Sequence, residues 1–250
     1  CTACHEPAVV DHRSASSSVG VHRYRRAVTS PESVRASSEN DRDVALATDA
    51  QRRLLAHLDR LVAADLLDVA APSRLPGWTV GHVITHVTHS DDGHIRMLDG
   101  ASAGVVAAQY PDGSVGRAAA IEAGSGRPAQ EQVDSLRASI AQLEERWANS
   151  DWTGRGAAAA GAVDIRHLPF LRLREVAIHH VDLAIGVEFD DLPDEYLRLE
   201  LRRMEMLWKA RQPMGLTPLP AAALAVAPSI RLAWLMGRTE IDGLPPAAIF

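Results

Sequence analysis

The stretch LRLREVAIHHVDLAIG, residues 171–186, is an apolar helical pattern interrupted by side chains that can bind a metal ion. Glu175, His179 and Asp182 stand at positions i, i+4 and i+7, so they project from one face of an α-helix. A carboxylate and an imidazole one turn apart can share a metal ion, and a further acid can hold an imidazole or a substrate proton. His180 points about 100° away from His179 on the helix and should not share the site.

One helix offers too few ligands for tetrahedral zinc, so a second segment must contribute. The candidate is GWTVGHVITHVTH, residues 77–89, where His82, His86 and His89 also fall on one helical face. The residues alone do not choose between His82 and His86. Histidines and acids also meet on helices as solvated faces or hydrogen-bonded core residues. Two such patterns within apolar stretches favour a metal site, because polar groups on a buried helix need partners.

The spacing of apolar residues predicts a helical protein. Four long helices are expected at about 43–69, 79–98, 129–147 and 168–185. Another helix is expected to start within 191–196, and a short one to cover 227–238. Residues 99–127 read as a long loop holding a short helix at 118–123, and residues 149–164 as a short hairpin or loop. Four helices with two long connections fit a bundle with crossover loops, and metal sites in bundles form between facing helices.

Composition narrows the class of protein. The net charge of −6 with scattered basic residues argues against a nucleic-acid surface, and the absence of a run of ~18 apolar residues argues against a membrane span. The only cysteines are Cys1 and Cys4, so a site in the body of the chain cannot use thiolates, and sulfur chemistry needs a thiol from a cofactor. CTACH, residues 1–5, matches a haem-attachment pattern, but residues 1–42 are polar and Ser-rich and are expected to be a disordered or spurious N-terminal extension.

Five segments resemble the mycothiol-dependent maleylpyruvate isomerase family, in the family's order: LPGWTVGHVITHV (75–87), YPDGSVGRAAAIEAG (110–124), REVAIHHVDL (174–183), DLP (191–193) and AWLMGR (233–238). The resemblance implies a mainly α protein: a DinB-like, metal-binding four-helix bundle over 43–187, followed by a small α/β C-terminal domain over 188–250. Because little chain is left for that domain, we expect it to be reduced.

The resemblance also implies the site. By motif, the metal ligands for Zn²⁺ or another divalent ion are His86, Glu175 and His179. Asp182, Arg117 and Arg238 match family positions with catalytic roles, and the two arginines also match positions that bind substrate or cofactor carboxylates. Asp182 would orient His179 or handle a proton.

The implied activity is a zinc- and mycothiol-dependent cis–trans isomerase of the maleylpyruvate isomerase type, in which a zinc-activated thiolate adds to the substrate double bond. The alternatives are a mycothiol S-transferase acting on an electrophilic small molecule, and a non-enzymatic metal-binding DinB-like protein. The expected partners are a small-molecule substrate and a low-molecular-weight thiol, with no nucleic acid or membrane, in the cytoplasm. The physiological substrate, the thiol and the oligomeric state stay open at this point.

Overall fold

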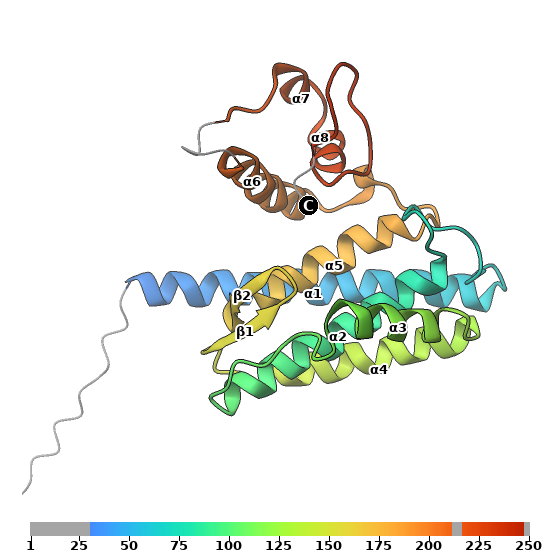
Figure 1. The fold of residues 1–250 in the computed structure, drawn as a ribbon, viewed down its shortest axis with the longest axis vertical. Helices are drawn as coiled ribbons and strands as arrows, with labels where there is room; N and C mark the ends of the chain where they lie inside the picture. The colour runs from blue at the N-terminus through green and yellow to red at the C-terminus, as the bar shows by residue number, and fades with distance from the viewer. Residues whose placement is uncertain (1–30, 212–216, 248–250) are drawn as a thin grey trace, which may run out of the picture.

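The computed structural model describes residues 31–211 and 217–247 (Figure 1). The chain is mainly helical, as predicted. Its elements are α1 (Pro31–Ala63), α2 (Val80–Ser102), α3 (Gly113–Ser125), α4 (Ala129–Ala148), β1 (Arg155–Ala158), β2 (Gly161–Asp164), the 3-10 turn η1 (Ile165–His167), α5 (Leu168–Asp182), the 3-10 turn η2 (Phe189–Asp191), α6 (Asp194–Ala210), α7 (Ala221–Ala225) and α8 (Pro228–Leu235).

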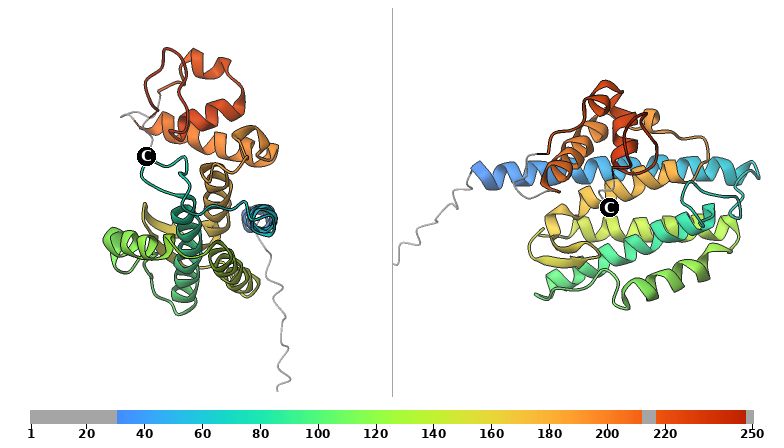
Figure 2. Two further views of the ribbon diagram at one scale, coloured as in Figure 1. Left: turned by 90° about the vertical axis from the view of Figure 1, so that its right-hand side faces the viewer. Right: turned by 45° about the horizontal axis from the view of Figure 1, so that its top comes forward.

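Helices α1, α2, α4 and α5 form a four-helix bundle, and α3 lies along the outside of α2 (Figures 1 and 2). Apolar residues at helical spacing supply the core. Leu54 and Leu58 of α1 are buried against Val83 and Val87 of α2, with Val176 of α5 in the same cluster. Each such side chain contributes ~1.5–3 kcal/mol by leaving water. The four predicted helices are therefore confirmed, and α2 and α5 are neighbours.

Helix α1 begins at Pro31, well before the expected start at Asp43. Proline suits the first turn of a helix, because the N–H groups of that turn make no hydrogen bond within the helix and proline has no N–H to leave unpaired. The buried Asn40 side chain donates a hydrogen bond from Nδ2 to the carbonyl of Arg166 at 2.8 Å. The prediction that residues 31–42 belong to a disordered extension was therefore wrong. Residues 1–30, including the CTACH pattern, lie outside the described residues.

The C-terminal helices lie on one side of the bundle, next to α5 (Figure 2). Trp208 of α6 packs on the fully buried Trp234 of α8, with ring centroids 5.0 Å apart. A continuous apolar cluster joins these residues to Leu173 and Ile178 of α5. Within the described part of 188–250 there are helices and loops but no strand, so the α/β character expected there is not found. Pro218 and Pro220 explain part of this, because proline cannot donate to a sheet ladder. The domain boundary at 187/188 stays a prediction.

The observed sheet is the antiparallel hairpin β1–β2, within the stretch expected to be a hairpin or loop. The loop before α3 pairs with it: the backbone N–H of Gln109 donates to the carbonyl of Ala157 at 2.8 Å. Glycine lets these segments approach α2. A Cβ atom on Gly156 would lie 2.7 Å from Sδ of Met97, and one on Gly93 would lie 2.6 Å from Cγ of Gln109. Hairpin and loop are thereby held beside the bundle, where they border the site.

None of the helices in the described ranges is both long and apolar enough to cross a lipid bilayer.

Candidate metal centre

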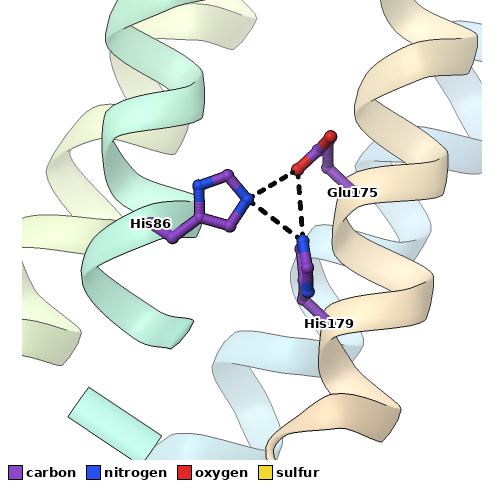
Figure 3. Close-up of side chains that lie close together, drawn as sticks. All are labelled: His86, Glu175 and His179. Atoms are coloured by element: carbon purple, nitrogen blue, oxygen red, sulfur yellow. Dashed lines mark hydrogen bonds and ion pairs between the residues drawn. The ribbon is translucent and has the colours of Figure 1, made fainter. Parts of the chain in front are cut away.

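Three side chains from two facing helices converge in the bundle (Figure 3). His86 comes from α2, and Glu175 and His179 come from successive turns of α5. His86 Nε2 lies 3.1 Å from Glu175 Oε2 and 3.1 Å from His179 Nε2, while His179 Nε2 lies 3.4 Å from Glu175 Oε2. The two helices therefore present two nitrogens and one oxygen to a single point.

This triangle fits a small divalent cation. Ligand atoms ~2.1 Å from a tetrahedral zinc ion stand ~3.4 Å apart, close to the distances seen here. Glu175 Oε2 is enclosed and faces two imidazole nitrogens, His86 Nε2 at 3.1 Å and His179 Nε2 at 3.4 Å. Two imidazoles and a carboxylate are a donor set that Zn²⁺ accepts, and three protein ligands leave an open position, which is typical of catalytic sites.

A second layer of side chains holds His179. Its Nδ1 donates to Asp182 Oδ2 at 2.9 Å, and the fully buried Asp182 carboxylate also accepts bonds from Arg238 Nε and Nη2 at 3.1 and 3.0 Å. A proton on Nδ1 leaves the lone pair of Nε2 directed at the centre. Asp182 thus contacts His179, and Arg238 contacts Asp182. Both residues were predicted from the sequence to be catalytic, and both lie next to the centre without being part of the triangle.

The electrostatics favour an ionised Glu175 between the imidazoles. Burial raises the pKa of Glu175, but hydrogen bonds and charges of His179 and His86 outweigh it and hold that pKa well below its ordinary value. Burial lowers the pKa of His179, yet the hydrogen bonds to Asp182 and Glu175 raise it to about 9. Burial lowers the pKa of His86, against the opposing effect of Glu175.

Arg117 reaches the centre from α3. Its Nη2 donates toward His86, lying 3.1 Å from Nδ1 and 3.4 Å from Nε2. The guanidinium lies over two aromatic rings, 5.8 Å from the centroid of Trp78 and 5.5 Å from that of Tyr110. Both rings line a cavity of about 700 Å³ that also borders the three converging side chains. Neither ring was among the site residues predicted from the sequence, although Trp78 stands in the motif 75–87 and Tyr110 in the motif 110–124.

The other histidines have separate roles. His82 closes a capping box at the start of α2: the backbone N–H of Thr79 donates to its Nδ1 at 3.2 Å. His89 pairs with the exposed Asp92 at 3.2 Å. His180 lies 2.9 Å from His57 of α1, nitrogen to nitrogen, away from the centre as expected. Of the α2 histidines that shared one face in the sequence, only His86 lies with Glu175 and His179.

Comparison with known proteins finds one family. The family model described as "Mycothiol maleylpyruvate isomerase N-terminal domain" matches residues 47–184. Two similar solved structures are the crystal structure of the mycothiol-dependent maleylpyruvate isomerase and that of its histidine-to-alanine mutant. Each is 21% identical to this chain, covers 80% of it and 90% of the solved chain, and superposes with a TM-score of 0.68. That identity supports a shared fold. No curated protein sequence matches the chain.

Proposed function

The chain belongs to the mycothiol maleylpyruvate isomerase family, and from this membership we propose that it is a metal- and mycothiol-dependent cis–trans isomerase of a small unsaturated acid. The observation that carries the proposal is the open triangle of His86, Glu175 and His179 at the wall of a cavity of about 700 Å³. These residues would hold Zn²⁺ or a similar divalent ion. When bound, such an ion lowers the pKa of a coordinated thiol, so that a thiolate nucleophile exists at neutral pH.

The side chains around the centre suit this chemistry. Asp182 fixes the orientation and tautomer of His179, and Arg238 neutralises the buried Asp182 carboxylate. Thiol addition to a cis double bond leaves a single bond about which the carbon skeleton rotates, and elimination returns the thiol with the trans isomer. The reaction consumes no thiol and needs no oxidant or reductant, because the elimination reverses the addition. Charge that develops on the oxo-acid end of the substrate needs a cation nearby, which Arg117 supplies.

The contact between Arg117 and His86 depends on whether a metal ion is bound. A guanidinium only donates hydrogen bonds, so its present contact uses Nδ1 of His86 as an acceptor. A neutral imidazole that binds an ion through Nε2 carries its proton on Nδ1, and Arg117 then loses that acceptor. We expect the guanidinium to turn from His86 toward an anionic group in the cavity.

A thiol S-transferase is the second candidate. The wall formed by Leu75, Trp78 and Tyr110 favours it, because an apolar aromatic wall also suits a hydrophobic electrophile. A non-enzymatic metal-binding protein is the third. Both isomerase and transferase require the thiol, so thiol-dependent turnover would exclude the third candidate.

The test uses the full chain. Metal content is measured by mass spectrometry for the wild type, His86→Ala and the matched control His82→Ala. One zinc per chain in the wild type and control, and none in His86→Ala, supports the centre. Conversion of maleylpyruvate is then followed with and without mycothiol. Zinc-loaded protein that converts no maleylpyruvate would refute the isomerase, and mycothiol consumption with an electrophile would favour the transferase.

A further inference from the structure

A second cavity borders the same centre from another side. It has a volume of about 350 Å³, and the residues that line it and not the first cavity are His94, Ala160, Leu171, Arg174, Ile178, Met236 and Arg238. Gln109, Ala158, Ala159, Glu175 and His179 border both cavities. The first cavity lies on the α3 side of the centre and the second on the side of α8. A molecule in either one can therefore approach Glu175 and His179, whereas His86 borders the first cavity.

The two cavities differ in charge and size. Of the described residues that line the first cavity, only Arg117 carries a permanent positive charge. Two guanidiniums border the second: Arg174, whose Nε donates to Glu200 at 2.7 Å, and Arg238, which is paired with Asp182. The smaller cavity thus has two guanidiniums in its wall against one in the larger cavity, and each of the two is held in place by a paired carboxylate. It suits a compact acid, whereas the larger, aromatic cavity suits a bulkier molecule.

His94 is the unusual residue of the second cavity. Its side chain is 2% exposed, and Nδ1 is enclosed without a hydrogen-bond partner in the described part of the chain. The neighbouring guanidinium of Arg172 is already bonded to Gln51, the carbonyl of Val87 and Asp91. Burial, together with the charge of Arg172, lowers the pKa of His94 to about 4, so the ring is neutral at pH 7 and offers one donor and one acceptor nitrogen.

A buried polar group without a partner destabilises a fold, and most such groups in native proteins have a partner. Arginine has no acceptor atom, so neither arginine at this cavity can accept a hydrogen bond from a ring N–H of His94. A ligand oxygen in the cavity can pair with the ring, either as an acceptor for the ring N–H or, when it carries a hydroxyl proton, as a donor. An oxygen of a ligand in the cavity would thus give His94 Nδ1 the partner that it lacks in the described part of the chain.

We propose that the second cavity binds the carboxylate-bearing electrophile, that His94 is a specificity-determining residue which hydrogen-bonds an oxygen of that molecule, and that the larger cavity receives the thiol cosubstrate. This assignment of the two molecules to the two cavities rests on the proposed function. The binding of a small dicarboxylate beside His94 is measurable without turnover.

The experiment titrates maleate, as the dicarboxylate probe, and mycothiol separately into zinc-loaded full-length protein by calorimetry. In His94→Leu we expect maleate to bind at least ~10-fold more weakly, from the loss of one hydrogen bond to a charged ligand. Zinc content and mycothiol binding should not change. The melting temperature should stay the same or rise, because leucine replaces an unpartnered buried polar group with an apolar one.

Two further variants separate the alternatives. His94→Gln keeps a donor and an acceptor and should bind maleate within ~3-fold of the wild type. Trp78→Ala, in the wall of the larger cavity, should weaken mycothiol and leave maleate unchanged. Wild-type maleate affinity in His94→Leu overturns the proposal, as does a loss confined to Trp78→Ala. Equal loss of maleate binding and of melting temperature in both His94 variants assigns a structural role instead and also overturns it. Failure of the proposed function has a different signature, namely normal binding of both probes with no conversion of maleylpyruvate.

Discussion

Asp182→Asn tests how the second layer controls the metal centre. The substitution keeps the shape of the side chain and removes its charge. The carboxylate now accepts hydrogen bonds from His179 Nδ1 at 2.9 Å and from Arg238 at 3.0 and 3.1 Å. Losing a carboxylate that orients a ligand histidine typically costs ~10–100-fold in metal affinity, or ~1.4–2.7 kcal/mol.

Proton competition makes this loss depend on pH. The pKa of His179 is about 9, because hydrogen bonds to Asp182 and Glu175 outweigh its burial. Since the pKa is raised, the ring is protonated at pH 7, and an entering ion must displace that proton. Two pH units below the pKa, this weakens apparent metal affinity by ~100-fold. Asp182→Asn lowers the pKa of His179 toward its ordinary value and relieves this competition. The two effects oppose each other at pH 7, and only the loss remains at pH 9.

The assay is a zinc titration against a chelator at pH 7 and pH 9, with Asp92→Asn as the control. Asp92 is an exposed carboxylate on α2 that pairs with His89 and should not matter at either pH. We expect Asp182→Asn to weaken zinc binding by ~10–100-fold at pH 9 and by clearly less at pH 7. Unchanged affinity at pH 9, or the same loss at both pH values, would refute the role assigned to the Asp182–His179 pair.

Three further predictions follow from individual contacts. His82→Ala should keep its zinc but lower the free energy of unfolding by ~1 kcal/mol, because it removes half of a capping box, whereas His86→Ala should lose zinc; metal analysis and urea titrations check both. The pKa of His94 is lowered to about 4, so the stability that its neutral form contributes is complete above pH 6.5 and lost as pH falls toward 4; His94→Leu should flatten this acid limb in urea titrations at several pH values. Deleting residues 1–42 should lower the melting temperature relative to deleting 1–30, because the longer deletion removes a buried side-chain hydrogen bond; equal melting temperatures would contradict this.

The helices were predictable because the periodicity of apolar residues is a strong signal. Glu175 and His179 share a face through a spacing of four residues, and that face had to meet another helix. Spacing could not choose the partner on α2, since His82 and His86 also differ by four. In the structure the two histidines differ in their partners, because the ring of His82 caps the N-terminus of its own helix. The signal was present, because Thr79 stands three residues before His82, the interval of a capping box.

The walls of the two cavities could not be predicted in the same way. Gln109 and Tyr110 belong to a loop with no periodicity, and their place depends on close approach between segments far apart in the chain. Gly93 and Gly156 permit that approach, but a glycine in a sequence does not say which segment will approach it. His94 was equally hidden, because a lone histidine in an apolar helix resembles any core residue until its lack of a partner is seen.

The proposed division of labour between the cavities has a consequence for isomerisation. A cis–trans change swings one half of the substrate about a new single bond while the other half stays in place. A site that clamped both ends of a dicarboxylate would resist that motion. Under the proposed assignment, Arg238 and His94 hold one end in the cavity of about 350 Å³, and the other end can swing in the cavity of about 700 Å³, where Arg117 is the one arginine among the described lining residues. Arg117 would then meet the moving carboxylate near the end of its rotation, so Arg117→Ala should slow turnover more than it weakens maleate binding. Steady-state kinetics set against calorimetry would decide, and an equal loss in both would place Arg117 in ground-state binding instead.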